Sequence, residues 1–338
     1  MDKIRLGGIK IAEGRSHLIT ANSAGESALP DICARLAANR INLNHLTSMD
    51  AAPEGDEAVS LCVERAEGYN TYFLIKALLG GSDRIHLQED VNILAIFPHD
   101  KKPAVAGNLL RQLAKLSINV HGVASSPAAM AFVVAAADTM KVIDGLFGAF
   151  TFPAYPSPFD WYAAYQGREQ VLKEIICSYE EQVIKVYNVA QEKDLDLWHL
   201  EVPGVQLGEL GTVFQNLDQT GLRLPFLVAI PLAPELESVQ VACCLARSAQ
   251  VEIRDCLGRQ LPTVRVLGQQ PAALFSLVGP HFGDRHGITN TLVNAMRVAE
   301  ISPLCMSCAI HSISVVVRED DLDRTLNVLN GPFAIPAQ

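Results

Sequence analysis

The sequence lacks the patterns that mark membrane and secreted proteins. Its longest apolar run, Ala128 to Ala137, falls far short of the roughly 20 residues that a membrane-spanning helix needs. The N-terminal MDKIRLGGIK has no apolar stretch typical of a secretory signal peptide. We therefore expect neither a membrane as partner nor secretion.

Positive charge is also scarce. The chain has 27 lysines and arginines against 37 aspartates and glutamates, which gives a formal net charge of −10. Nucleic acid is an unfavourable partner for such a chain, because phosphate binding needs a basic surface. The eight cysteines are scattered without the spacing of a disulfide framework, so the predicted location is the reducing cytoplasm.

Short catalytic motifs are missing as well. The chain contains no GxSxG, HExxH or P-loop pattern, and no pairing of a nucleophile with a base stands out. We expect no catalytic residues and no cofactor.

Two groups of residues have the chemistry of metal ligands but lack the spacing of a metal site. Cys305-x-x-Cys308 has no second CxxC to complete four zinc ligands, and on a strand the two thiols would face opposite sides, so buried cysteines are predicted. A second group of potential ligands matches no common metal motif, and consists of His281, Asp284, His286 and His311. No metal site is predicted.

A helix-then-strand junction occurs four times along the chain. The junctions contain Ile41, Ile118, Leu222 and Ile301. The offset from Ile41 to Leu222 is 181 residues, and that from Ile118 to Ile301 is 183. Near-equal offsets indicate a duplicated pair of units.

The last unit shows the expected element order most clearly. Apolar periodicity and turn residues predict strands and helices in the order βαββαβ, an antiparallel sheet with two helices on one face. The predicted elements are a strand at Phe275–Val278, a helix with Ile288, Leu292 and Met296, strands at Ile301–Ala309 and Ser314–Val317, a helix with Leu322, Leu326 and Leu329, and a strand at Phe333–Ile335.

The first unit carries the clearest amphipathic stripe. After a strand at His17–Ala21, a helix is predicted from apolar residues at i, i+3, i+4, i+7 and i+8, with Pro30 in its first turn. These apolar residues are Leu29, Ile32, Cys33, Leu36 and Ala37. A connecting helix is predicted at Phe159–Ile176, whereas the second helix of the third unit is poorly marked around Ser248–Leu257.

At this point the residues resemble a known family. The loop GPHFGDRHGI and the strands ISPLCMSCAIHS and ISVVVRED look like the second ACT module of an aspartokinase regulatory region. The resemblance covers nearly the whole chain apart from the connecting helix. It implies an α+β chain of four ferredoxin-like βαββαβ (ACT) modules, with antiparallel sheets, helices on one face, and two pairs side by side.

The resemblance also implies domain boundaries, because in that family the first module is inserted in the second. The first pair would cover 1–155, with module one at about 14–89 and module two at 1–13 plus 90–155. A connecting helix at 156–177 would lead to the second pair at 178–338. There, module three would be at about 193–268 and module four at 178–192 plus 269–338. From the 181–183 offset we expect the first and third modules to pair within the chain, and likewise the second and fourth.

A kinase domain is not apparent. The sequence has no Lys-Phe-Gly-Gly motif and no room for such a domain before the first unit. The predicted function is therefore not enzymatic: the chain would bind a free amino acid and serve allosteric regulation of amino-acid biosynthesis. The ligand would be lysine, threonine or another small amino acid, and the client an enzyme such as an aspartokinase.

Two other functions remain open. The chain could be an interaction module that acts by protein pairing alone, as a monomer with an internal pseudo-dimer or as a homodimer. An enzyme of another kind would need titratable groups clustered in a pocket.

The resemblance places a ligand site in the first unit. A helix N-terminus can hold a carboxylate, and side-chain oxygens on the next strand could receive an ammonium group. Asn44 stands where lysine-sensing members carry an aspartate. The same residues could instead be ordinary capping and turn residues. The carried-over positions are Asn22, Gly25, Ala28, Leu29, Asn42, Leu43, Asn44, Thr47 and Ser48.

A weaker or composite site is predicted in the third unit. Pro225 replaces the acidic position there, and the strand LPFLVAI is apolar. Its candidate ligand-binding residues are Gly204, Gln206, Leu207 and Gly208.

Overall fold

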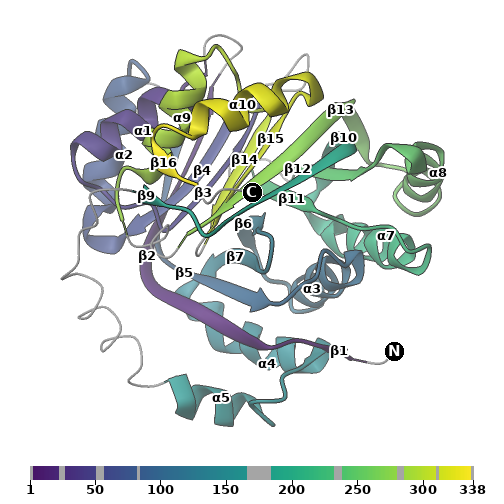
Figure 1. Ribbon diagram of the computed structural model, residues 1–338. Helices are drawn as coiled ribbons and strands as arrows, with labels where there is room; N and C mark the ends of the chain where they lie inside the picture. The colour runs from purple at the N-terminus through teal and green to yellow at the C-terminus, as the bar shows by residue number, and fades with distance from the viewer. Residues whose placement is uncertain are drawn as a thin grey trace.

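The fold is a closed barrel of twelve antiparallel strands with helices packed outside it (Figure 1). It is seen in a computed structural model that describes residues 3–22, 27–50, 57–81, 84–165, 184–231, 238–279, 285–309 and 312–335. Around the barrel the strands follow in the order β10-β12-β11-β6-β7-β5-β2-β4-β3-β14-β15-β13, and β13 pairs with β10 to close it.

The first half of the chain supplies two segments that share a long strand. Segment one runs from β2 to β5, and segment two from β5 to β8; each has the order strand, helix, strand, strand, helix, strand. The elements are β1 (Ile4–Arg5), β2 (Gly8–Asn22), α1 (Leu29–Ala38), β3 (His45–Met49), β4 (Glu57–Glu64), α2 (Gly68–Leu78), β5 (Ile85–Phe97), α3 (Pro103–Lys115), β6 (Val120–Ser125), β7 (Met130–Ala135), α4 (Thr139–Ala149), β8 (Phe150–Thr151) and α5 (Pro158–Tyr165).

The second half follows the same order. Segment three runs from β10 to β13, and segment four from β13 to β16. The elements are β9 (Ile184–Lys185), β10 (Asn188–Pro203), η3 (Gly204–Gln206), α7 (Leu207–Gln219), β11 (Phe226–Pro231), β12 (Ser238–Ala246), η4 (Arg247–Ala249), α8 (Gln250–Gln260), β13 (Arg265–Val278), α9 (Ile288–Val298), β14 (Cys305–Ala309), β15 (Ser312–Val317), η5 (Glu319–Asp321), α10 (Leu322–Leu329) and β16 (Phe333–Ala334).

Local sequence patterns account for the individual elements. The predicted stripe of the first unit lies on α1, where Leu29, Ile32, Cys33 and Leu36 are buried against the sheet. Helix α9 buries the predicted Ile288, Leu292 and Met296 in the same way. Of the predicted connecting helix, α5 is present, while the part after Tyr165 lies outside the described residues.

The predicted fold class is wrong in its sheet organisation. Instead of four ferredoxin-like ACT modules with their own sheets, twelve strands form one continuous sheet, and β1 with β8 and β9 with β16 form two small two-stranded sheets. The reason is that long strands serve two segments each. In β2, Gly8–Ala12 pair with β5 of segment two, whereas Arg15–Asn22 pair with β4 of segment one. Closure leaves none of these twelve strands with an unpaired edge.

The expected partners within the chain are also wrong. Strand β3 of segment one pairs with β14 of segment four, and β6 of segment two pairs with β11 of segment three. Above these joins α1 packs on α9 and α3 packs on α7. The segments are therefore joined first to fourth and second to third, not first to third.

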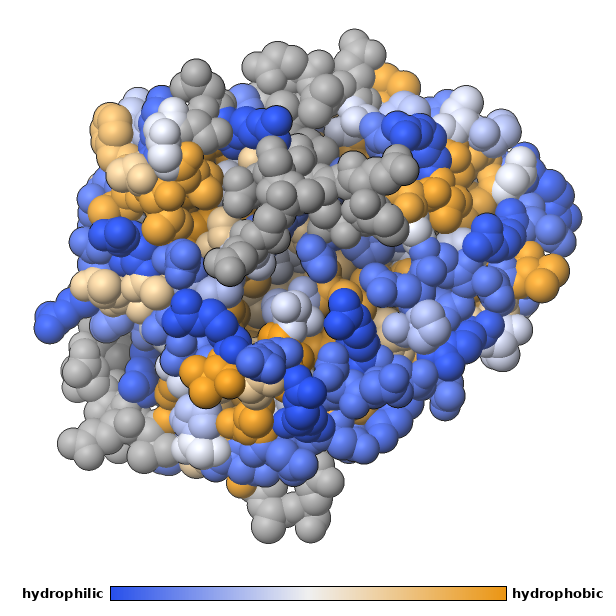
Figure 2. All heavy atoms as spheres, turned by 90° about the horizontal axis from the view of Figure 1, so that it is seen from above, coloured by the Kyte–Doolittle hydropathy of each residue, from blue (hydrophilic) through white to orange (hydrophobic). Residues whose placement is uncertain are grey.

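Two large apolar clusters lie between the barrel and its helices. One contains residues of α3, α4, α7 and α8, and the other contains residues of α1, α2, α9 and α10. Two smaller clusters come from the alternate residues of the strands, which face the barrel interior. From above, the surface shows separate apolar patches among hydrophilic side chains (Figure 2). Among the described residues no helix is both long and apolar enough to cross a membrane.

Candidate functional site

The structure splits the predicted ligand site of the first unit into two places. Ala28 and Leu29 stand at the start of α1, near the beginning of β4, where Asn22 pairs with Glu57. Asn44 lies at the other end of β4, where its backbone N–H donates to the carbonyl of Cys62. The two places are five residue steps apart along β4, from Glu57 to Cys62, a distance of about 17 Å. A single small ligand cannot contact both.

The remaining positions of that site are distributed in the same way. Thr47 and Ser48 are buried within β3, while Asn42 and Leu43 precede the strand. Of Asn22 only the backbone, at the end of β2, is described, and Gly25 lies outside the described residues.

The N-terminus of α1 is already occupied by a carboxylate from its own segment. Glu57 Oε2 accepts a 2.7 Å hydrogen bond from the backbone N–H of Ala28, and Oε1 accepts one from Ser27. Burial raises the pKa of Glu57, and the hydrogen bonds from Ser27 and Ala28 oppose that rise. Glu57 therefore takes the position that a ligand carboxylate would need. No sequence spacing reveals this contact, which only the pairing of β2 with β4 creates.

The N-terminus of α9 is open by comparison. Gly287 precedes it in the left-handed conformation, with φ of 85°, and has no side chain to cap the helix. Among the described residues no side chain accepts a hydrogen bond from the first-turn N–H groups of Ile288, Thr289 or Asn290. These groups retain the unpaired donors that favour an anion.

A small cavity lies where this helix start meets segment one. It measures about 10 Å³, room for about one water molecule. Cys33, Leu36, Ala37, Ile41 and Leu43 line it from segment one, and segment four contributes Arg285, Gly287, Ile288, Thr289 and Asn290. Next to Leu43, the side-chain oxygen Oδ1 of Asn44 is buried and has no hydrogen-bond partner among the described residues. The cavity thus joins a helix start and a strand start from different segments.

The predicted third-unit site is used for packing. Gly204 and Gln206 lie in η3, and Leu207 and Gly208 begin α7. A Cβ atom on Gly208 would lie 2.9 Å from Cβ of Ala114, so this helix start lies directly against α3. Gln206 Oε1 accepts a hydrogen bond from Thr263.

A group of buried histidines was not anticipated from the sequence. His17 Nε2 lies 2.8 Å from Ser60 Oγ, and the rings of His17 and His121 are 5.8 Å apart. Neither ring nitrogen of His45 has a hydrogen-bond partner among the described residues. Burial lowers the pKa of His45 to about 4; burial, with the nearby His121 and His45, lowers that of His17. Strand alternation, which directs these side chains inward, was the available signal.

The suspected metal ligands do not assemble in the described part of the chain. No three His, Cys, Asp or Glu side chains gather there in a way that could hold a metal ion. His281, Asp284 and His311 lie outside the described residues. Cys305 and Cys308 belong to different apolar clusters, inside and outside the barrel, and burial raises the pKa of both thiols, to about 11 for Cys308.

Comparison with known proteins gives a match in structure only. No family model and no curated protein matches the chain. An aspartate kinase from Synechocystis superposes with a TM-score of 0.79 at 14% identity, and the match covers 99% of this chain and 58% of that one. The chain thus spans 58% of the length of that enzyme. At this identity the match establishes the fold.

Shorter matches involve part of the chain. The regulatory subunit of aspartate kinase from Thermus thermophilus, in its ligand-free form, is 12% identical, with 43% of this chain and 99% of that chain covered and a TM-score of 0.39. E. coli aspartokinase III, solved in complex with aspartate and ADP, is 16% identical, with 44% and 34% covered and a TM-score of 0.34. TM-scores below 0.5 support no conclusion on fold or function.

The whole-chain match corrects three predictions. The assignment to a regulatory region freed from its enzyme is wrong, because 99% of the chain follows the fold of an aspartate kinase. The conclusion that the chain is not an enzyme falls with it, since it rested on the missing kinase domain. The description of the chain as a stand-alone, non-catalytic sensor built of tandem ACT modules is wrong for the same reason. The likeness to aspartokinases is supported at the level of the fold.

Proposed function

We propose that this chain serves the aspartate kinase reaction, the ATP-dependent phosphorylation of aspartate, within the protein that carries it out. The supporting observation is the superposition of 99% of the chain on an aspartate kinase with a TM-score of 0.79. The chain covers 58% of that enzyme at 14% identity, so the activity is inferred from the fold alone.

The test is an assay of ADP release by the natural protein that contains this chain. We expect release that depends on both aspartate and ATP, and loss of that release when the α3/α7 packing is disrupted. The absence of aspartate-dependent ADP release would reject the proposal.

We further propose that the chain binds a free amino acid where α9 begins. The uncapped N–H groups of α9 suit the ligand carboxylate, and the unpartnered oxygen of Asn44 suits an ammonium group. The candidates are lysine, threonine or another small amino acid. This arrangement keeps two residues of the predicted site, Leu43, which lines the cavity, and its neighbour Asn44, and combines them with the helix start of segment four.

Binding at this place requires movement. The present cavity of about 10 Å³ holds about one water molecule, so an amino acid must separate the start of α9 from the residues before β3. We therefore expect binding to shift α9 relative to α1.

Calorimetric titration with each of the twenty amino acids tests this proposal. We expect selective binding of one or two amino acids, and at least a tenfold loss of affinity in Asn44→Ala. Asn70→Ala is the matched control, because Asn70 is exposed on α2 and, among the described residues, its side chain donates only to Glu67. No binding at millimolar concentration, or equal affinity in Asn44→Ala, would contradict the site.

The proposed location is the cytoplasm. All the described cysteines are free and buried, which is usual for a reducing compartment. The net charge of −10 supports small molecules rather than nucleic acid as partners.

A further inference from the structure

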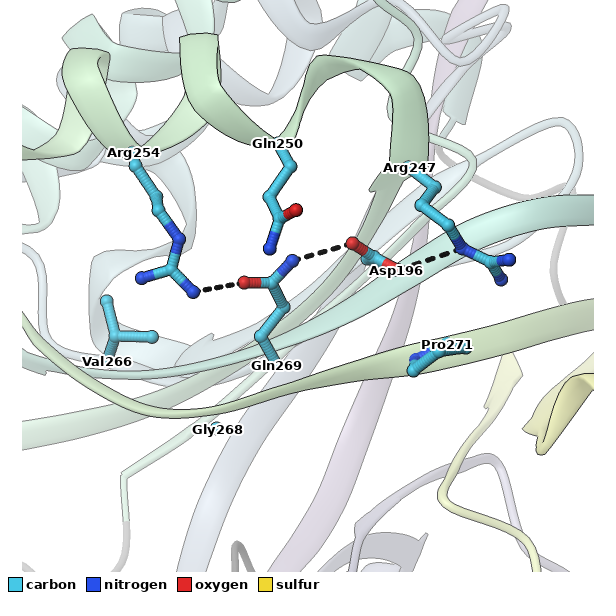
Figure 3. Close-up of a pocket in the computed structure, with 8 residues that line it drawn as sticks. All are labelled: Asp196, Arg247, Gln250, Arg254, Val266, Gly268, Gln269 and Pro271. Carbon is cyan, nitrogen blue, oxygen red and sulfur yellow. Dashed lines mark hydrogen bonds and ion pairs between the residues drawn. The ribbon is translucent and has the colours of Figure 1, made fainter.

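A polar groove lies beside α8, in segment three, and shares no lining residue with the site proposed above. It encloses about 500 Å³ and opens to solvent between α8 and the strands β10 and β13. This volume falls within the range typical of small-molecule sites. The residues that matter here are Asp196, Arg247, Gln250, Arg254, Val266 and Gln269 (Figure 3).

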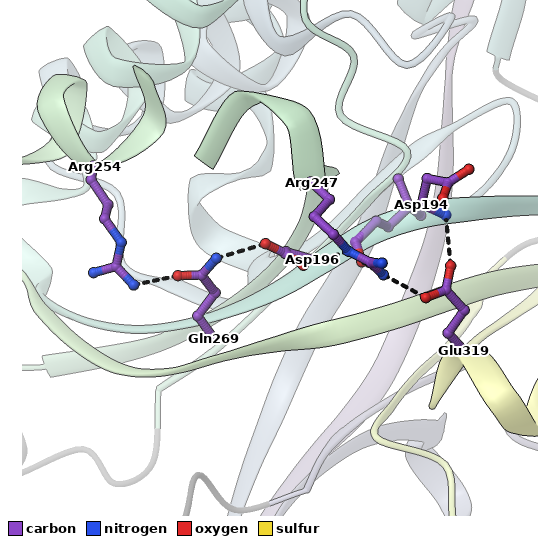
Figure 4. A network of polar contacts seen from close by, with 7 residues as sticks. Asp194, Asp196, Arg247, Arg254, Gln269 and Glu319 are labelled. Atoms are coloured by element: carbon purple, nitrogen blue, oxygen red, sulfur yellow. Dashed lines mark hydrogen bonds and ion pairs between the residues drawn. The ribbon is translucent and has the colours of Figure 1, made fainter. Parts of the chain in front are cut away.

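The groove is built around a buried acid. Asp196 is only 4% exposed. Its Oδ2 accepts a 2.6 Å hydrogen bond from Gln269 Nε2, and its Oδ1 accepts one of 3.2 Å from Arg247 Nε. Arg247 also donates from Nη2 to Glu319 Oε2 at 2.7 Å (Figure 4). These contacts hold one wall of the groove in place and neutralise Asp196.

Two donors of the groove remain available. Arg254 donates to the side-chain oxygen of Gln269, and among the described residues it contacts no carboxylate. Its guanidinium lies 5.1 Å from the centre of the Trp198 ring, which orients it. The side-chain amide of Gln250 makes no polar contact in the described part of the chain, and Figure 3 shows it projecting from α8 into the groove.

The other three segments close the equivalent place. In each segment a strand ends in a 3-10 turn, and a helix follows the turn. The residue two positions before the turn pairs with a residue of the neighbouring strand, and the helix begins above that neighbouring residue. Gly68 packs on Ser16 so closely that a Cβ atom would lie 2.4 Å from the hydroxyl oxygen. Asn92 Nδ2 donates to Thr139 Oγ1 at 2.9 Å.

In segment four the equivalent pair is Ala273 and Leu322. Both are apolar and fully buried in the same cluster. Segment three differs from the other segments, because its equivalent pair is Asp196 and Gln250 and both residues line an open groove. A buried carboxylate such as that of Asp196 is a costly feature for a position that packing alone could fill, and Gln250 and Arg254 stand exposed above it. This difference within one chain indicates a binding role.

We infer that this groove binds a small monocarboxylate through Arg254 and Gln250. A guanidinium pairs with a carboxylate through two parallel hydrogen bonds, and the Gln250 amide can add a third. Val266 and Pro271 supply apolar contact for a short carbon chain. The site goes beyond the aspartate kinase function proposed above.

Charge favours a monoanion over phosphate. Arg247 is shared between Asp196 and Glu319, so Arg254 carries the positive charge that no carboxylate contacts among the described residues. One negative charge balances it. A phosphate, with close to two negative charges, would place the excess beside the buried Asp196.

The two tryptophans of the chain allow a direct test. Trp161 is buried far from the groove and donates to the Ile9 carbonyl, so Trp161→Phe leaves Trp198 as the reporter beneath Arg254. We expect acetate, propionate or butyrate at millimolar concentration to change Trp198 fluorescence saturably, relative to sodium chloride of equal ionic strength. Calorimetry on the unmodified chain gives the dissociation constants.

Variants decide whether the groove is responsible. Arg254→Gln should weaken binding at least tenfold and Gln250→Ala severalfold, whereas Arg259→Gln, on the same helix but outside the groove, should bind as the wild type. Asn44→Ala should leave this binding unchanged, which separates it from the amino-acid site. The inference is overturned if no carboxylate binds saturably, if Arg254→Gln binds normally, or if inorganic phosphate binds more tightly than every carboxylate.

Discussion

The two helix pairs on the barrel join equivalent segments in different ways. Between α3 and α7 the backbones are in contact: a Cβ atom on Gly107 would lie 2.5 Å from the carbonyl oxygen of Gly211. Between α1 and α9 a cavity remains, and the nearest neighbour of a Cβ atom on Gly287 would be Ala37, at 3.9 Å. The α3/α7 pair is therefore closely packed, whereas the α1/α9 pair retains a small cavity.

Polar groups strengthen the same contrast. In the α3/α7 pair the buried Gln215 accepts from Arg111 Nη1 at 2.5 Å and donates to Asn108, while Asp218 caps α3 through the Ala104 N–H. At the α1/α9 pair no described side chain caps the first turn of α9. Satisfied donors make an interface rigid, and unsatisfied donors favour a ligand.

The largest expected effect comes from filling the glycine contact. Gly107→Ala places a methyl group against the Gly211 carbonyl and the Gln215 side chain, so we expect a loss of about 2–3 kcal/mol in the free energy of unfolding. Gly258→Ala on α8 is the control, because nothing lies within 4 Å of its added methyl. That control should stabilise by up to about 1 kcal/mol. Urea denaturation measures both; equal effects would show that α3 and α7 are not closely packed.

Acid should act on the histidines inside the barrel, two of which belong to β2 and β3 beneath α1. Because burial lowers the pKa of His45 from 6.5 to about 4, the unfolded chain binds a proton more readily between these values. Stability is therefore retained above pH 6.5 and lost as pH falls toward 4. For His45 alone the loss at pH 5 is about 2 kcal/mol.

His45→Leu tests the origin of that acid sensitivity. Leucine has a similar volume and leaves no unpaired ring nitrogens, so we expect about 1 kcal/mol of stabilisation at pH 7.5. The difference in unfolding free energy between pH 7.5 and pH 5 should also become smaller. An unchanged pH dependence would assign the acid sensitivity to other groups.

A smaller effect is expected when α1 is made to resemble α9. Glu57→Ala removes the carboxylate that accepts from Ala28 and Ser27, which should reduce stability by about 1 kcal/mol. Thermal unfolding with and without amino acids measures the change. If the uncapped α1 now binds an amino acid, the contrast between the two helix starts depends on Glu57 alone; if stability is unaffected, Glu57 is not an effective cap.

The smallest effect concerns the ion pair across α1 and α9. Arg297 Nη1 lies 3.6 Å from Asp31 Oδ1, and both side chains are more than half exposed. We expect Arg297→Gln to change the free energy of unfolding by less than about 0.5 kcal/mol. A loss of several times this value would mean that the charge pair, and not the apolar contact, holds α9 on α1.

Much of the secondary structure was predictable from local patterns. The stripe on α1 and that on α9 follow directly from apolar spacing, and Cys305 and Cys308 fall on opposite faces as strand alternation requires. Helix α8 was poorly marked because its apolar face is short: Ile253, Cys256 and Leu257 are its buried residues. That same weakness in the pattern coincides with the polar groove.

The candidate site was less predictable than the elements around it. The family resemblance predicted the start of α1 and the Asn42–Asn44 strand start in one site, on adjacent elements. In the structure the start of α9 meets a strand start from another segment instead. The 181–183 residue offset also led to the wrong pairing of segments, because an internal repeat shows which segments are equivalent and not which of them become neighbours.

The sequence by itself determined most of the helices and strands, because apolar periodicity, glycine and proline act over a few residues. Only the tertiary structure decided that twelve strands close into one barrel, that α3 and α7 lock while α1 and α9 leave a cavity, and that Asp196 lies beneath an open groove. These features depend on contacts between residues far apart in the chain, such as Gly107 with Gly211 and Asp196 with Gln269. No local pattern encodes such a contact, since its energy arises only when both partners have already folded.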